Sequence, residues 1–153
     1  MDNEHIKIVT ENRKARHEFT INDEIEAGMV LRGTEVKSLR EGRANLKDAY
    51  GKIKNGELYV YQMHISPYPF AHHDNHEPGR PRKLLLHKSE LKRLLGKVQE
   101  KGFTLVPLRV YFKNGKAKIK IALARGKRKY DKRRAIKERE LKREMDREKK
   151  QRR

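Results

Sequence analysis

The stretch VPLRVYFKNGKAKIKIAL, residues 106–123, decides the fold of this 153-residue chain. Asn114-Gly115 tolerates the two positive φ angles of a type I′ turn, so the stretch predicts a β-hairpin. Alternate residues point to the same face of a strand, and two alternating sets are apolar: Val106, Leu108, Val110 and Phe112 on the incoming strand, and Ala117, Ile119, Ile121 and Leu123 on the returning strand. The opposite face of the returning strand then carries a ladder of three lysines: Lys116, Lys118 and Lys120.

The same signals recur upstream. Asn55-Gly56 lies between two strand-like runs and predicts a second hairpin. Phe19, Ile21 and Ile25 share one parity among polar residues, which predicts a strand with one buried face.

Two short helices are expected between the strands. The first spans Thr34 to Glu41, with Thr34 as N-cap and Gly42 at its end. The second spans Ser89 to Lys101, with apolar residues at helical spacing, Ser89 as cap and Gly102 at its close. Several short strands, two tight hairpins and few helices predict a mainly β fold, namely a small OB-like antiparallel barrel with two or three flanking helices.

The composition changes near Arg125. Residues 125–153 hold 16 Lys or Arg and six Asp or Glu, and therefore +10 of the formal charge of +19. This segment has few sizeable aliphatic side chains and cannot form a core of its own. We expect an RNA-binding barrel domain over residues 1–124 and a basic C-terminal tail over 125–153, disordered when the protein is alone and helical when bound.

So large a basic excess predicts a polyanionic partner, by default nucleic acid, because lysine and arginine release counterions from phosphate. An anionic membrane is the competing partner, but the tail lacks the aromatic or leucine-rich face of a membrane-surface helix. The chain has no cysteine, which excludes disulfides and thiol chemistry and fits a cytoplasmic protein. Neither a signal peptide nor a transmembrane run of 18 apolar residues is visible, so we expect no membrane association.

Two residue clusters invite other functions. Asp23, Glu24 and Glu26 are candidate paired carboxylates, but no phosphate loop or nucleophile motif accompanies them, so solvated strand residues are the better interpretation and no catalytic residue is expected. His72, His73 and His76 hold possible metal ligands, yet the following prolines and glycine favour a polar surface loop. We therefore expect neither a metal nor a cofactor.

Four basic runs support RNA binding: residues 12–17, residues 80–83, Lys37 with Arg40 and Arg43, and the lysine ladder. Rings that could stack on bases lie near these runs: His17, Tyr68, Phe70 and Tyr130.

The blocks GTEVKSLR at residues 33–40 and GKRKYDKR at 126–133 make the chain similar to the SsrA-binding protein (small protein B) family. NRKARHE at 12–18, EAG at 26–28, RKLLL at 82–86 and IKERE at 136–140 extend the resemblance in the same order along nearly the whole chain. The resemblance implies an OB-like barrel, and a protein that binds the tRNA-like part of transfer-messenger RNA and delivers it to stalled ribosomes. It also implies elongation factor Tu as a partner through the shared RNA, and we expect a monomer.

The resemblance assigns residues as well. The implied RNA-binding set is Asn12, Arg13, Glu26, Lys37, Arg40 and Leu85. The implied ribosome-contacting tail set is Lys127, Arg128, Tyr130, Asp131, Lys132, Arg133, Ile136 and Lys137. A general OB-fold RNA-binding or ribosomal protein is the alternative that composition and fold leave open.

Overall fold

The computed structural model describes residues 5–100, 102–127 and 129–151. It contains nine strands: β1 (Ile6–Glu11), β2 (Phe19–Met29), β3 (Ala44–Asn45), β4 (Tyr50–Lys54), β5 (Glu57–Tyr61), β6 (His64–Ile65), β7 (Arg82–Leu85), β8 (Phe103–Lys113) and β9 (Lys116–Gly126). It also contains four helices: α1 (Ala15–Glu18), α2 (Gly33–Arg40), α3 (Lys88–Val98) and α4 (Lys129–Gln151).

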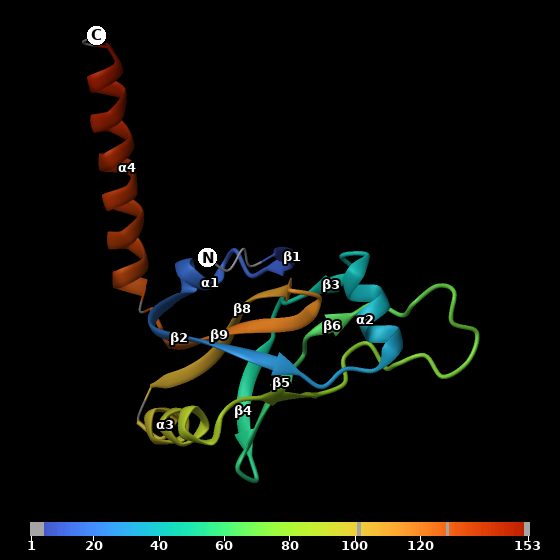
Figure 1. Ribbon diagram of the computed structural model, residues 1–153. Helices are drawn as coiled ribbons and strands as arrows, with labels where there is room; N and C mark the ends of the chain where they lie inside the picture. The colour runs from blue at the N-terminus through green and yellow to red at the C-terminus, as the bar shows by residue number, and fades with distance from the viewer. Residues whose placement is uncertain (1–4, 101, 128, 152–153) are drawn as a thin grey trace.

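The strands form an OB-like barrel (Figure 1). Antiparallel pairings lead from β8 through β4, β5, β7, β2 and β9, and the β8–β9 hairpin returns the order to its start. Strand β1 pairs with the second half of β8. Both Asn-Gly turns are confirmed, with φ of 52° and 73° at Asn55 and Gly56 and 51° and 81° at Asn114 and Gly115. The predicted fold class is therefore confirmed.

The apolar parity expected for β8 and β2 is wrong, because each strand contains a β-bulge. The register shifts between Pro107 and Arg109 on β8, and between Ile21 and Asp23 on β2. One extra residue reverses which face each later side chain occupies. Two clusters of apolar side chains result. On each of the two strands, the side chains of the expected apolar parity contribute to one cluster up to the bulge and to the other cluster beyond it.

The main core lies inside the barrel and includes Ile25 of β2, with Val110 and Phe112 of β8. A smaller cluster lies on the other face of the sheet, where Val106, Leu108, Ala122 and Ala124 pack with Ala15 of α1, and Phe19 and Ile21 lie against it. Strand β9 keeps the expected parity, since Ile119, Ile121 and Leu123 belong to the main core and Ala117 packs against it.

The two middle helices differ from the expected ones at their ends. Helix α2 begins at Gly33 with Arg32 as the N-cap residue, and α3 begins at Lys88 with His87 in that position. Thr34 and Ser89 are therefore not the caps. Thr34 is instead engaged by its hydroxyl with His76, and α3 ends at Val98, before Lys101, which lies outside the described residues. Leu39 of α2 and Leu94 of α3 both join the main core.

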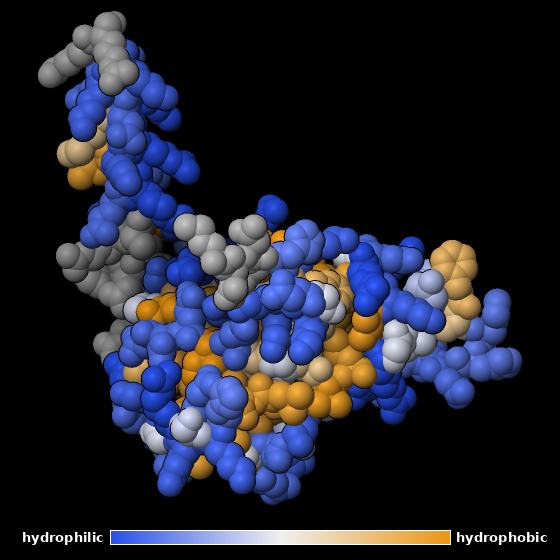
Figure 2. Space-filling view, viewed as in Figure 1, coloured by the Kyte–Doolittle hydropathy of each residue, from blue (hydrophilic) through white to orange (hydrophobic). Residues whose placement is uncertain are grey.

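The tail forms α4, which projects away from the barrel (Figure 1). The part of its surface that Figure 2 colours is mostly hydrophilic, and its apolar residues Ile136, Leu141 and Met145 are exposed. The backbone N–H of Lys127 donates to the Glu18 carbonyl at 2.9 Å, and the Lys127 ammonium donates to the Arg16 carbonyl at 3.0 Å. These bonds join the start of the tail to α1.

Candidate nucleic-acid interface

A polar face crosses four neighbouring strands on the outside of the barrel. The register places Arg109 of β8, Lys120 of β9 and Glu26 of β2 in one row. The next row holds Tyr111, Lys118, Gly28 and Leu85, the last from β7. We call these two rows the platform. Each side chain stands on a hydrogen-bonded strand, so the backbone ladders set the spacing between them.

Glu26 is held at the centre of the platform. The Tyr111 hydroxyl donates a hydrogen bond to Oε2 of Glu26, and the Lys113 ammonium lies 3.5 Å from Oε1. The Tyr111 bond, with help from Lys113 and Lys118, lowers the pKa of Glu26 below its usual value although partial burial opposes the shift. A carboxylate offers about four lone-pair positions, so Glu26 can still accept bonds from a ligand.

A hollow opens beside Glu26. Gly28, Leu85 and Lys118 line it, together with the start of α3 at His87 and Glu90. Leu85 is 53% exposed, so its apolar side chain is available to a ligand in this hollow. The structure thus brings together two residues of the implied RNA-binding set, Glu26 and Leu85, around one hollow with a lysine.

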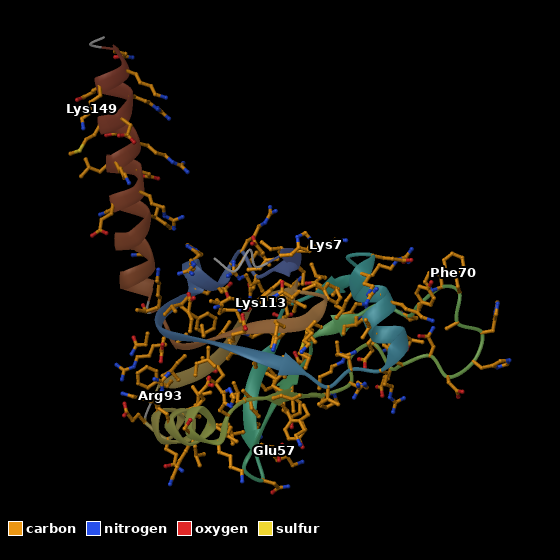
Figure 3. All side chains as sticks on the ribbon, viewed as in Figure 1. Lys7, Glu57, Phe70, Arg93, Lys113 and Lys149 are labelled. Atoms are coloured by element: carbon orange, nitrogen blue, oxygen red, sulfur yellow. The ribbon has the colours of Figure 1, made fainter. Side chains whose placement is uncertain are left out.

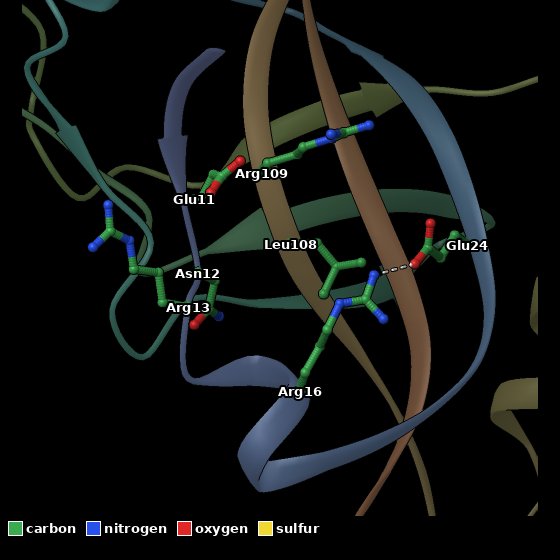
Figure 4. A pocket seen from close by; sticks show the side chains of 7 residues that line it. All are labelled: Glu11, Asn12, Arg13, Arg16, Glu24, Leu108 and Arg109. Atoms are coloured by element: carbon green, nitrogen blue, oxygen red, sulfur yellow. Dashed lines mark hydrogen bonds and ion pairs between the residues drawn. The ribbon is translucent and has the colours of Figure 1, made fainter. Parts of the chain in front are cut away.

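Asn12 and Arg13 line a second hollow, shown in Figure 4, with Arg16, Leu108 and Arg109. Glu24 lines both hollows, so the two lie side by side, and its carboxylate pairs with Arg16 at 2.9 Å. The two hollows and the platform therefore form one continuous face.

Asn12 has a structural role as well. Its amide Nδ2 donates to the carbonyl of Pro107 at 3.2 Å, and its backbone N–H donates to that of Leu108 at 2.7 Å. Both acceptors belong to the bulge of β8. Asn12 therefore fastens the chain before α1 to the bulge, while Arg13 remains exposed on the surface.

Lys37 and Arg40 lie apart from this face, on exposed positions of α2. The Lys37 ammonium is 5.5 Å from the Tyr68 ring centre, and the Arg40 guanidinium is 5.8 Å from that of Phe112. Neither residue lines either hollow. The implied RNA-binding set is thus spread over two surfaces, one on the strands and one on α2.

A buried ion-pair network positions α2. Glu35 is fully buried, and its carboxylate accepts bonds from Nε of Arg82 at 2.6 Å, Nε of Arg80 at 3.1 Å and the backbone N–H of Arg32 at 2.8 Å. Burial alone would raise the pKa of Glu35, but the three donors outweigh it and lower that pKa. Arg82 also donates to the carbonyls of Met63 and Pro78.

This network changes the interpretation of the basic run at residues 80–83. Arg82 is fully buried, and Arg80 pairs with Glu35. Two of its three cations therefore serve the fold and do not form an RNA surface. Lys83, the third, pairs with Glu57 at 2.7 Å on the outside of the barrel.

His76 belongs to the fold for the same reason. Its ring is buried, with Nδ1 2.9 Å from the Thr34 hydroxyl and Nε2 2.9 Å from the Ile65 carbonyl. Both ring nitrogens are thus engaged. Among the described residues, no group of three His, Cys, Asp or Glu side chains is arranged to hold a metal ion.

The implied tail set is only partly described. Lys127 contacts α1, while Arg133, Ile136 and Lys137 are exposed on α4. Arg128 lies outside the described residues, as do the side chains of Tyr130, Asp131 and Lys132. Farther along α4, Nη2 of Arg139 lies 3.2 Å from Nδ1 of His17.

Sequence reasoning missed two platform residues, Arg109 and Tyr111. They alternate with Val110 and Phe112, so the parity of the hairpin already placed them on the lysine side. The signal was present, but the direct link from Tyr111 to Glu26 depends on the pairing of β9 with both strands.

No helix within the described ranges is long and apolar enough to span a membrane.

Three comparisons with known proteins point to the same family. The family model described as SmpB protein matches residues 9–151. The SsrA-binding protein of Symbiobacterium thermophilum is 62% identical over 143 residues, covering 93% of this chain and 90% of the relative. That of Desulforudis audaxviator is 61% identical over 141 residues, 92% of each chain. A solved structure described as "tmRNA-SmpB: a journey to the center of the bacterial ribosome" superimposes with a TM-score of 0.67 at 50% identity, covering 83% of this chain and 93% of the other.

Proposed function

Because this chain belongs to the SmpB protein family of SsrA-binding proteins, we propose that it binds the tRNA-like part of transfer-messenger RNA and delivers it to stalled ribosomes. It acts in the bacterial cytoplasm, where ribosomes are, and contributes binding without catalysis. The stalled peptide is then tagged for degradation and the ribosome is released. The observation that carries the proposal is the platform around Glu26, on a chain whose relatives are named for this RNA.

The platform suits a structured RNA better than a uniform polyanion. Lys118, Lys120 and Arg109 supply cations for phosphates, which position the RNA without reading its sequence. Glu26 would repel phosphate, so its place at the centre implies a donor opposite it, either a base amino group or a 2′-hydroxyl. Leu85 offers an apolar surface for a base or sugar. Recognition therefore depends on where the RNA places its donors.

The tail serves the ribosome in this proposal. Helix α4 is rich in lysine and arginine, which suits ribosomal RNA lining the empty message channel of the small subunit. A ribosome with a message in that channel would exclude the tail. The tail thereby couples delivery to the absence of a codon.

The test is a binding titration at fixed physiological salt that compares transfer-messenger RNA with an unrelated structured RNA of equal length. We expect a preference of at least about 100-fold, equivalent to about 2.7 kcal/mol. Equal affinities that fall together as salt rises would leave a general RNA-binding protein as the better description.

Two variants tie the preference to the platform. Glu26→Ala and Leu85→Ala should each reduce the preference for transfer-messenger RNA. The matched controls are Glu57→Ala, which removes an exposed carboxylate from β5, and Leu95→Ala, which removes a 39% exposed leucine from α3. If the controls weaken binding as much as the platform variants do, the platform is not the recognition surface.

A further inference from the structure

The loop between β6 and β7, residues 66–81, carries two neighbouring aromatic side chains, Tyr68 and Phe70, which we call the aromatic corner. Phe70 is 70% exposed, the most exposed of the large apolar side chains in the described ranges. Figure 3 shows its ring at the outer end of the loop, directed away from the barrel. The ring of Tyr68 lies edge-on to it, with centroids 5.5 Å apart and planes at 67°.

The loop is fastened in this conformation. The Asn75 side chain bridges both backbone groups of Tyr68, accepting from its N–H at 3.2 Å and donating to its carbonyl at 3.0 Å. The Ala71 N–H donates to the same carbonyl at 3.1 Å. Beyond the corner, buried His76 and Arg82 bind the returning strand of the loop to the body. The exposure of Phe70 is therefore a built feature of a structured loop.

The surroundings of the corner indicate its ligand. Lys37 lies over Tyr68, one turn of α2 before Arg40. Rings beside cations suit an unpaired nucleotide, whose base stacks on the ring while its phosphate meets the cation. The corner is too small, and too closely flanked by His72, His73 and Asp74, to bury the apolar face of a protein partner.

We propose that Phe70 stacks on an unpaired base of transfer-messenger RNA, with Tyr68 supporting the Phe70 ring edge-on and Lys37 on the adjoining phosphate. The inference rests on the proposed function, and it adds a contact on the α2 side of the barrel, away from the platform. Lys37 links the two proposals, because it already belongs to the implied RNA-binding set.

The chain contains no tryptophan, so Phe70→Trp places a single indole at the corner. Saturating transfer-messenger RNA should quench its emission strongly. The matched control is Leu95→Trp on α3, whose emission should change little. Unchanged emission at Phe70→Trp, under conditions where the RNA is bound, would overturn the proposal.

Affinity gives the second readout. Phe70→Ser should weaken binding of transfer-messenger RNA about fivefold to 100-fold, the range expected for one lost base stack. Phe70→Trp should retain affinity, whereas Phe70→Leu, which stays apolar but lacks a ring, should not. Equal affinity of Phe70→Leu and wild type would show that apolarity alone matters and would overturn the stacking role.

The remaining outcomes separate the two proposals. Normal preference for transfer-messenger RNA in Phe70→Ser, together with its loss in Glu26→Ala, would sink the corner and leave the proposed function intact. Loss of affinity only for isolated small ribosomal subunits would assign the corner to ribosomal RNA instead. If light scattering showed a dimer for the wild type and a monomer for Phe70→Ser, the corner would instead be a contact with a second copy of the chain.

Discussion

The hydroxyl of Tyr111 on β8 reaches over the whole width of β9 to donate a hydrogen bond to the carboxylate of Glu26 on β2. The acidic centre of the platform is thus oriented by a residue from a different strand. Since a hydrogen bond to the ionised form favours ionisation, Tyr111 both orients the Glu26 carboxylate and lowers its pKa.

Replacing that donor should change the titration of Glu26. In Tyr111→Phe the pKa of Glu26 should rise toward its ordinary value, which carboxyl-carbon NMR can follow. The folded protein holds this pKa below the ordinary 4.5, so the stabilisation is complete above about pH 4.5 and is lost as the pH falls through the lowered pKa. Wild type should therefore exceed Tyr111→Phe in stability by about 1.5 kcal/mol at neutral pH, and by less in acid. A gap that does not shrink in acid would contradict the assignment.

Gly51 should not tolerate a side chain. It pairs with Leu105 where β4 meets β8, and an added Cβ would lie 2.9 Å from the Leu105 Cβ. Neither atom can rotate away from the other, so Gly51→Ala should cost about 1–3 kcal/mol in urea unfolding. Gly96→Ala on α3 is the matched control: its added Cβ meets nothing within 4 Å, and it should gain up to about 1 kcal/mol. Equal stability of the two variants would refute the close contact.

Glu35 should matter far more to stability than an exposed glutamate does. Glu35→Ala leaves Arg82 buried without its carboxylate and should cost about 3–5 kcal/mol. Glu57→Ala, which breaks an exposed pair with Lys83, should have a far smaller effect, because solvent screens an exposed ion pair. Thermal and urea unfolding measure both. A small effect of Glu35→Ala would mean that water reaches Arg82 readily.

The tail should be separable from RNA binding. Truncation before Lys132 should leave the affinity for transfer-messenger RNA largely intact and abolish peptide tagging in a reconstituted translation assay. Glu26→Ala in the full chain should instead weaken the affinity for the RNA and lower tagging at limiting RNA concentration, and tagging should recover when the RNA is raised to saturation. If truncation alone removed the affinity, the division of labour between barrel and tail would be wrong.

The α4 helix should be only marginally stable in the free protein. It has few apolar side chains, all those described being exposed, so it lacks the packed apolar face that stabilises most protein helices and depends on weak pairs such as Glu138 with Lys142. Backbone amides over residues 133–151 should exchange with solvent rapidly in the free protein and slowly on the ribosome. Strong protection without the ribosome would contradict the predicted disorder of the tail when alone.

Sequence patterns predicted the structural features that depend only on residues close together along the chain. The Asn114-Gly115 turn, the parity of β9 and the helical spacing of Leu91 to Val98 are local, and the structure confirms them. The bulges in β2 and β8 were not predicted, because a bulge is fixed by pairing with another strand. Pro107, which cannot donate to a ladder, was the available hint.

In the candidate site, too, the sequence predicted individual residues but not which of them lie together. Parity placed Lys118 and Lys120 on the outside of the barrel, and the resemblance supplied Glu26 and Leu85, but only the strand order shows that these four meet. The buried role of Arg82 was also hidden. An arginine within a basic run looks like surface until its carboxylate partner, 47 positions away along the chain, is known.

The bulge of β8 also sets the distance between the two ends of the binding face. Asn12 is tied to the carbonyls of that bulge, while Tyr111 lies beyond the bulge on β8 and binds Glu26 of β2. Side chains can swing, but peptide groups locked in a barrel cannot slide past one another. An RNA whose contact groups are spaced differently could therefore engage one end of the binding face or the other, and never both at once. This protein would thus select its RNA by the spacing of those groups as well as by their chemistry.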